Sequence, residues 1–169
     1  MRKIKKRFSQ GEIREYLTQY PLWKFNKYLR KVEYHVNNRG YFHYIARIFW
    51  KIKLKKVSLK LGWLIPPNSC EAGLCIVHPG TVVINDKARI GKNVRIHVCV
   101  NIGGAGNVAP VIGDNVYIGP GAKIYGDIFI GNNVSIGANA VVNKSFGDNV
   151  LLFGVPSIAK LKEDKQRED

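Results

Sequence analysis

Residues 84–142 read INDKARIGKNVRIHVCVNIGGAGNVAPVIGDNVYIGPGAKIYGDIFIGNNVSIGANAVV, and an aliphatic residue recurs there every six positions. A single ten-residue step, between positions 102 and 112, interrupts the frame. The recurring residues are Ile84, Ile90, Ile96, Ile102, Ile112, Ile118, Ile124, Ile130, Ile136 and Val142. A fixed internal period indicates a repeat architecture, so it constrains the fold before any other feature.

A period of six fits neither a helix, which repeats every 3.6 residues, nor a long alternating strand. It fits short strands joined by tight turns. In each unit the recurring aliphatic residue and the small residue two positions earlier face one side, and the residue between them faces the other. The glycine after many of the aliphatic residues, with Asn, Asp or Gly beyond it, supplies turn conformations. Three units make one coil, and stacked coils bury a continuous core, so we predict a β-solenoid of triangular section.

The repeats resemble those of the hexapeptide-repeat acyltransferases, whose fold is a left-handed parallel β-helix. The serine acetyltransferase-like branch, which includes enzymes that acetylate bacterial surface sugars, is the most similar part of that family. The motifs are GLCIVHPGTVVIN, IHVCVNIGG, IGPGAKIYGDIFIG, IGANAVVNKSF and GVPSIAK. The left hand is implied by the resemblance and not by the spacing, because parallel crossovers are usually right-handed.

The charge of the chain is concentrated at one end. Residues 1–60 hold 17 of the 27 Lys and Arg residues but 3 of the 12 Asp and Glu residues. Residues 61–169 are close to neutral, with 10 basic and 9 acidic residues. We therefore expect three parts: a basic, aromatic-rich helical segment over residues 1–60, the mainly β left-handed β-helix over residues 61–162, and a charged tail over residues 163–169.

The helical segment shows apolar residues at helical spacing. The spacing predicts helices from about residue 11 to residue 37, broken in two at Pro21 because proline removes a helical hydrogen bond, and from Tyr41 to Leu59. Ser9 and Glu12 have the spacing of a capping box.

Three interpretations of this basic segment remain open. It packs as a cap on the solenoid with solvated lysines outside, or it makes peripheral contact with a membrane surface, or it binds nucleic acid. No nucleic-acid motif accompanies the charge, so we do not expect the third.

Localisation is predicted from the absence of targeting and disulfide signals. No apolar run is long enough to span a bilayer, and no apolar signal-peptide region follows the basic N-terminus. The three cysteines, Cys70, Cys75 and Cys99, are odd in number and lack metal-type spacing. We expect a cytoplasmic protein with reduced thiols, in contact with the inner face of the membrane only if the second interpretation of residues 1–60 holds.

Two irregularities in the frame are the expected places for chemistry. Eight residues separate Ile76 from Ile84, which pushes out a turn over residues 77–81, and the ten-residue step extrudes a loop over residues 103–110. Insertions in a solenoid map to loops that often form the binding face.

His78 lies in the first irregular turn and is the candidate catalytic residue. An imidazole titrates near neutral pH and can take a proton from a hydroxyl group, although a turn histidine can also serve hydrogen bonding alone. The resemblance favours catalysis, because His78 aligns without a gap on the catalytic histidine of serine acetyltransferases. Counting units places His97 over Val77, either as a supporting or acceptor contact or as a plain turn residue. Glu71 is a candidate to orient His78.

Three positions depart from the serine acetyltransferase pattern. Val77 and Leu64 stand where the family has aspartates, and Ala109 stands where a second histidine helps bind serine. We therefore expect an acetyl-CoA-dependent O-acetyltransferase whose acceptor is a sugar hydroxyl in surface polysaccharide biosynthesis. The alternatives are serine O-acetylation in cysteine biosynthesis and, outside catalysis, a structural solenoid scaffold.

The resemblance also implies acetyl-CoA as co-substrate, bound in a groove between the subunits of a homotrimer. Small residues permit close backbone approach, lysines can meet phosphates, and an N–H group of the extruded loop is a candidate oxyanion donor. In the ordinary interpretation, these glycines only form turns and these lysines only carry solvated charges. The matching positions are Gly103, Gly104, Gly119, Ala122, Gly137, Ala138, Lys144 and Lys160. We expect no metal, because zinc needs three converging histidines on this fold and the predicted solenoid contains two.

Overall fold

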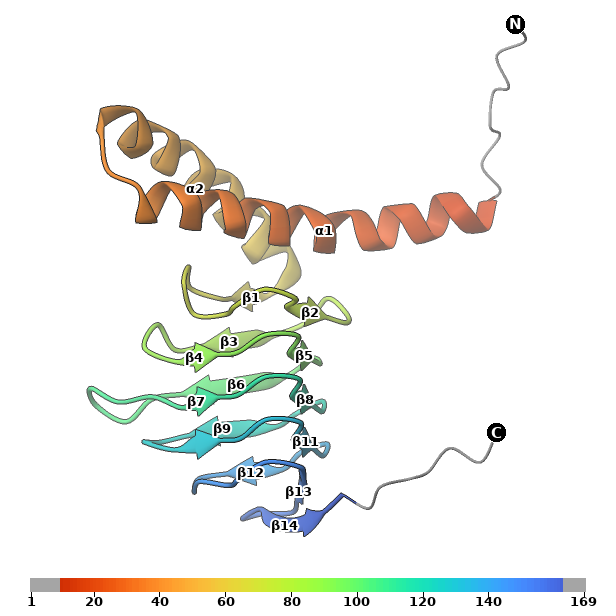
Figure 1. The fold of residues 1–169 in the computed structure, drawn as a ribbon. Helices are drawn as coiled ribbons and strands as arrows, with labels where there is room; N and C mark the ends of the chain where they lie inside the picture. The colour runs from red at the N-terminus through yellow and green to blue at the C-terminus, as the bar shows by residue number, and fades with distance from the viewer. Residues whose placement is uncertain (1–9, 163–169) are drawn as a thin grey trace, which may run out of the picture. The chain divides into compact units, whose positions relative to one another are not determined.

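The computed structural model describes the backbone of residues 10–162 and the side chains of residues 21–162 (Figure 1). Two helices, α1 (Gln10–Asn37) and α2 (Tyr41–Leu61), precede the strands. The strands are β1 (Trp63–Leu64), β2 (Cys75–Ile76), β3 (Val82–Ile84), β4 (Arg89–Ile90), β5 (Arg95–Ile96), β6 (Val100–Gly103), β7 (Val111–Ile112), β8 (Tyr117–Ile118), β9 (Lys123–Tyr125), β10 (Phe129–Ile130), β11 (Ser135–Ile136), β12 (Val141–Val142), β13 (Val150–Phe153) and β14 (Ile158–Leu161). The chain divides into two compact units after Val57.

The first unit is a helical hairpin whose first helix is continuous. The prediction of a break at Pro21 is wrong, because α1 runs through that residue. Phe25 and Leu29 are fully buried beyond it, and such packing, rather than propensity, provides most of the stability of a helix in a protein. The capping box at Ser9 lies outside the described residues.

Side chains of both helices hold the hairpin together. The rings of Tyr28 and Trp50 lie 5.6 Å apart between α1 and α2. At the turn, His35 and His43 share a hydrogen bond of 3.0 Å between their Nδ1 atoms. The second helix begins at Tyr41 as predicted and ends two residues later than predicted, at Leu61.

Three sheets form the walls of the second unit. The first wall has the order β1-β3-β6-β9-β12, the second wall β4-β7-β10, and the third wall β2-β5-β8-β11-β13, all parallel, with β14 added antiparallel at the end of the third wall. Figure 1 shows the coils stacked one upon another. The predicted β-solenoid with an N-terminal helical segment is confirmed.

The predicted frame fills the core. Strand register places aliphatic on aliphatic, as where Ile76 pairs with Ile96, Ile96 with Ile118, and Ile118 with Ile136. Every frame residue from Ile84 to Val142 is at most 2% exposed. Each such side chain contributes roughly 1.5–3 kcal/mol of burial free energy, so the stack of aliphatic side chains is the main source of cohesion in this unit.

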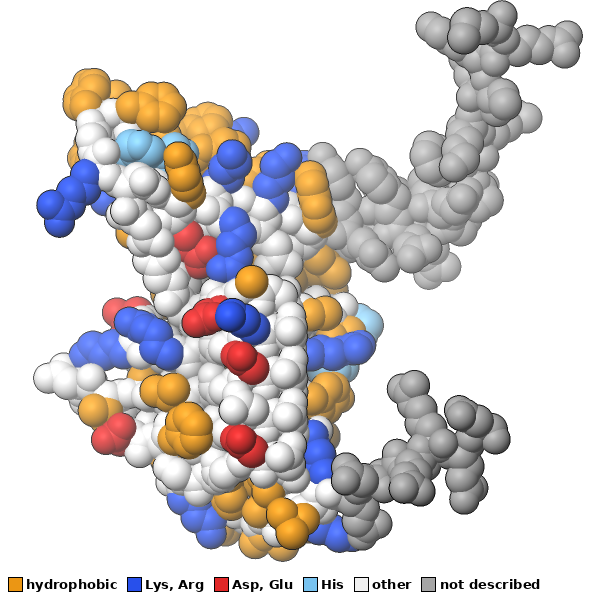
Figure 2. All heavy atoms as spheres, in the orientation of Figure 1, with side chains coloured by type: hydrophobic (Ala, Val, Ile, Leu, Met, Phe, Trp, Pro, Cys, Tyr) orange, Lys and Arg blue, Asp and Glu red, His pale blue; other side chains and the backbone are white. Residues whose placement is uncertain are grey.

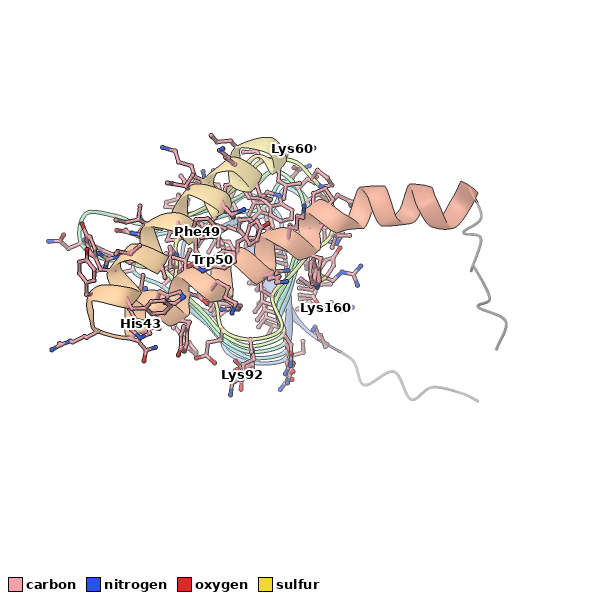
Figure 3. All side chains as sticks on the ribbon, turned by 90° about the horizontal axis from the view of Figure 1, so that it is seen from above. His43, Phe49, Trp50, Lys60, Lys92 and Lys160 are labelled. Atoms are coloured by element: carbon pink, nitrogen blue, oxygen red, sulfur yellow. The ribbon has the colours of Figure 1, made fainter. Side chains whose placement is uncertain are left out.

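The corner between the second and third walls repeats in every coil, and we call it the asparagine corner. Asn93, Asn115, Asn133 and Asn149 occupy one column of it with φ of 55–57°, a left-handed conformation that asparagine tolerates. Lys92, labelled in Figure 3, belongs to the neighbouring column.

Hydrogen bonds tie the asparagine corner from coil to coil. The Oδ1 atoms of Asp114, Asn132 and Asp148 each accept a backbone N–H bond of 2.7–2.8 Å from the preceding coil. These side chains occupy the space beside Gly91, Gly113 and Gly131, where a Cβ atom would lie only 2.1–2.6 Å from the same oxygens. Glycine is therefore required at those positions.

Both irregularities fall at the other two corners. The turn over residues 77–81 lies between the third and first walls, and we call this the histidine corner. The loop over residues 103–110 lies between the first and second walls, at the loop corner, and stands out from the stack between β6 and β7 (Figure 1). Ala105 and Val108 exchange backbone hydrogen bonds of 2.9 and 3.2 Å, so the loop is a small hairpin.

Candidate active site

Two histidines meet at the histidine corner. The N–H group of Val77 donates to the carbonyl of Ile96 over 3.1 Å, which places His97 in the next coil beside Val77. The ring centroids of His78 and His97 lie 6.2 Å apart, with their planes inclined at 60°. His78 is exposed at the surface, whereas His97 is half-buried. The corner thus presents one accessible imidazole beside a more sheltered one.

Arg95 and Tyr117 complete the surroundings of His97. The Tyr117 ring meets the His97 ring edge to face, with centroids 5.1 Å apart. Burial, followed by the positive charges of Arg95 and His78, lowers the pKa of His97 below the ordinary histidine value. The lowered pKa favours the uncharged ring of His97, which has one donor and one acceptor nitrogen.

Sequence reasoning did not include Arg95 or Tyr117 in the site. The coil register was the signal that could have found them, because Cys75, Arg95 and Tyr117 pair in successive strands of the third wall. The outward positions of one wall form a continuous ladder, so a residue near His97 can be predicted once the coil length is known.

Beyond His97, the column of corner residues that begins at Val77 continues with two glycines, Gly119 and Gly137. Backbone bonds from His97 to Ile118 and from Gly119 to Ile136 continue the column from coil to coil. A Cβ atom at Gly119 would lie 2.8–2.9 Å from the backbone of residues 136–138, so no larger residue fits there. Gly137 and the exposed Ala138 follow below. Gly119 is buried, so exposed backbone in this column begins at Gly137, beside the exposed side chains of Pro120 and Ala138.

The remaining candidate donor contacts lie elsewhere. Gly103 ends β6 and Gly104 begins the extruded loop, and Lys144 follows β12 at the same loop corner, with its ammonium group 5.6 Å from the centre of the Phe146 ring. Lys160 lies on β14, where it pairs with Leu151. In one chain the width of the first wall separates the loop corner from the histidines.

Two further predicted site residues, Ala122 and Glu71, are not brought to the histidines. Ala122 is fully buried in the core, so it offers no surface to acetyl-CoA in the single chain. Glu71 lies at the asparagine corner, where its N–H group donates to the carbonyl of Ile90 over 2.9 Å. The third wall therefore lies between Glu71 and His78.

The three departures from the serine acetyltransferase pattern have different surroundings. Leu64 is 64% exposed on the outer side of β1, and Val77 is half-buried beside His97. Ala109 is buried at the foot of the extruded loop. Apolar side chains thus occupy these three positions in the folded chain.

The described residues, 10–162, contain no metal-binding cluster and no membrane-spanning helix. In this range, no three His, Cys, Asp or Glu side chains converge as a metal would require. Neither α1 nor α2 combines the length and hydrophobicity needed to cross a bilayer.

Comparisons with known proteins point to one group of enzymes. Residues 109–144 match the family described as bacterial transferase hexapeptide (six repeats). The serine acetyltransferase of Mycobacterium tuberculosis is 44% identical over 116 residues, which are 66% of this chain and 51% of the relative. The chain therefore spans about half the length of this curated relative.

Solved structures show the same fold. A serine acetyltransferase in complex with CoA is 26% identical, with a TM-score of 0.68, over 84% of this chain and 60% of the other. The soybean serine acetyltransferase complexed with serine is 25% identical, with a TM-score of 0.69, over 88% of this chain and 61% of the other. The resemblance to hexapeptide-repeat acyltransferases of the serine acetyltransferase-like branch is confirmed.

The expected acceptor, a sugar hydroxyl in surface polysaccharide biosynthesis, is wrong. The curated relative at 44% identity and the similar solved structures are named serine acetyltransferases. The prediction rested on the polar groups missing at Val77, Leu64 and Ala109. Loss of one set of contacts does not identify a different acceptor, because other groups at the site can supply the hydrogen bonds.

Proposed function

We propose that this chain, which carries the solenoid of the serine acetyltransferases, transfers the acetyl group of acetyl-CoA to the hydroxyl group of L-serine. The observation that supports this most directly is the pairing of His78 with His97 at an expanded corner of a solenoid whose curated relative is a serine acetyltransferase.

In the proposed reaction, His78 acts as the general base. Its imidazole takes the proton of the serine hydroxyl while the hydroxyl oxygen attacks the thioester carbon of acetyl-CoA. The tetrahedral oxyanion then collapses, the carbon–sulfur bond breaks, and the thiolate of CoA receives the proton held by His78. The products are O-acetylserine and CoA, so atoms and charges balance.

Arg95 and His97 are the proposed acceptor contacts. The guanidinium group of Arg95 can bind the serine carboxylate through a charge-assisted hydrogen bond, and neutral His97 can accept a hydrogen bond from the ammonium group. Both groups lie in the coil next to the turn that bears His78, since Arg95 pairs with Cys75 and His97 lies beside Val77. They would replace the polar contacts that Val77, Leu64 and Ala109 do not provide.

The donor is proposed to lie along the lower part of the histidine corner. Gly137 and Ala138 are small and allow the pantetheine arm of acetyl-CoA to approach the backbone closely, and the buried Gly119 shapes the corner above them. A cytoplasmic location suits both this donor and the exposed free thiols of Cys75 and Cys99.

We further propose a homotrimer whose subunits complete each site. Gly103, Gly104 and Lys144 lie across the first wall from His78, so the loop corner of one subunit would supply the oxyanion N–H group and the phosphate contact to the histidine corner of the next. Exposed side chains on the walls, Tyr117 at 37% and Phe129 at 49%, offer apolar area for this assembly.

Sedimentation velocity is expected to show a trimer at micromolar concentration, because the site is divided between subunits. A stable monomer with full acetyl transfer activity would refute the assembly.

Acetyl transfer is expected to require both acetyl-CoA and L-serine. CoA release is measured with a thiol reagent that exceeds the three thiols of the chain, and O-acetylserine is identified by mass spectrometry. Replacing Arg95 by glutamine should raise KM for serine more than it lowers kcat, because the contact holds the carboxylate in both ground and transition states. Acetyl-CoA turnover that ignores serine would overturn the acceptor assignment.

A further inference from the structure

The second helix of the hairpin has two apolar faces. Its inward face carries Trp50 and Leu54, which is 7% exposed. Its outward face carries Tyr41, Ile45, Ile48, Ile52 and Leu59, each 44–82% exposed. These five residues fall on one side of an α-helix at spacings of four, three, four and seven. Figure 3 labels Phe49 and Trp50, neighbours in sequence that belong to the outward and inward parts of α2.

We call the five outward residues, together with Phe42, Tyr44 and Phe49, the α2 outer face. Exposed aliphatic residues that occur singly need no explanation, whereas a contiguous stripe along a helix marks an interaction site. The stripe is continuous for three turns, from Tyr41 to Ile52, and resumes at Leu59.

The charges of α2 are of one sign. The helix contains Arg47 and five lysines, at positions 51, 53, 55, 56 and 60, and contains no Asp or Glu. The lysines flank the apolar stripe on both sides, and the ammonium group of Lys53 lies 4.9 Å from the centre of the Phe49 ring. Figure 2 shows hydrophobic side chains gathered over α2 with Lys and Arg side chains beside them.

We propose that the α2 outer face binds the surface of an anionic phospholipid bilayer. The helix would lie in the plane of the interface, with Ile45, Ile48, Phe49 and Ile52 below the headgroups. Flanking lysines would bury their aliphatic stems and hold their ammonium groups among the lipid phosphates. This interaction is independent of the proposed acetyl transfer.

The positive charge of α2 argues against a second copy of this chain as the partner of the apolar stripe. A second copy of this chain would place six positive charges of one α2 against six of another, with no carboxylate between them on either helix. An anionic bilayer supplies both an apolar interior and the opposite charge, so it matches the stripe and its flanks together.

Flotation of the full chain with vesicles tests the proposal. Binding is expected to vesicles of phosphatidylcholine mixed with phosphatidylglycerol, to be weak with phosphatidylcholine alone, and to fall as salt is raised. Ile48→Glu/Ile52→Glu should abolish binding, because it places two carboxylates in the apolar stripe. The matched control Ile158→Glu/Leu161→Glu, at two exposed positions of β14, should retain it.

A second pair of variants isolates the charge. Lys55→Gln/Lys56→Gln should weaken binding by about 25-fold, since each lysine near an anionic leaflet contributes about fivefold in affinity. Lys87→Gln/Lys92→Gln removes the same charge from the solenoid and should have little effect. Thermal melts show that each variant is folded.

Two results would overturn the proposal. One is a wild-type chain that fails to float with anionic vesicles at low salt. The other is equal weakening by the two lysine pairs, which would mean unspecific attraction of a basic protein. A sedimentation mass that falls in Ile48→Glu/Ile52→Glu, without vesicle binding in the wild type, would assign the α2 outer face to a second copy.

Discussion

Replacing His78 by alanine is expected to lower kcat for acetyl transfer by about 10²–10⁴-fold, the usual contribution of a positioned general base. The affinity for acetyl-CoA should barely change, because the base acts on the proton of the acceptor and not on the donor. The measurement is steady-state kinetics with acetyl-CoA and L-serine varied separately, with a binding titration of CoA beside it.

Two controls accompany His78→Ala: its thermal midpoint, which reports folding, and the activity of His97→Ala. His78 lies in an exposed turn outside the aliphatic stack, so the thermal midpoint should stay close to that of the wild type. His97→Ala should cost less activity, as an acceptor contact would. Near-full activity in His78→Ala together with inactivity in His97→Ala would show that His97 is the base.

Gly131→Ala is expected to destabilise the solenoid by about 2–3 kcal/mol, as overpacking of a rigid site does. The new Cβ atom would lie 2.1 Å from Oδ1 of Asp148 and 2.6 Å from the backbone of residues 147 and 148. Backbone atoms in a hydrogen-bonded corner have little room to yield, and Asp148 would lose its 2.7 Å bond from Asn132 N–H. Urea unfolding followed by circular dichroism measures the change.

Gly147→Ala is the matched control for Gly131→Ala. Gly147 occupies the same column of the asparagine corner in the last coil, and a Cβ atom there would meet nothing within 4 Å. The substitution should therefore leave the free energy of unfolding nearly unchanged, or raise it slightly because alanine restricts the unfolded chain. If both variants lose the same stability, steric crowding between coils is not the cause.

The core of the solenoid could be predicted from the sequence because each coil repeats the same pattern of buried and exposed residues. A buried aliphatic residue every six positions specifies strand, turn and facing direction together, and the ten-residue step at position 102 specifies where the loop leaves the stack. Pro21 could not be treated in this way. Whether a helix survives a proline depends on the packing of residues such as Phe25 and Leu29, which local propensity does not include.

Part of the geometry of the candidate site could also be predicted from the repeat. His78 and His97 come from two successive coils, so counting units was enough to place them together. Arg95 and Tyr117 required the outward ladder of the third wall, and the burial of Ala122 required its inward position in the frame. The acceptor could not be derived from the apolar residues Val77, Leu64 and Ala109. The lack of polar groups at these positions shows which contacts are missing but not which acceptor binds.

The constant length of the asparagine corner limits where the solenoid can accept insertions. Four residues separate the paired positions of the second and third walls in all five coils. The side chains of Asp114, Asn132 and Asp148 each accept a bond from the backbone of the coil before. Insertions at the histidine corner and at the loop corner therefore leave the vertical alignment of the walls intact. An insertion at either corner can alter the ligand that the chain binds without changing the strand register between coils. Insertions that change specificity are therefore expected at the histidine corner and the loop corner, whereas the asparagine corner keeps a constant length.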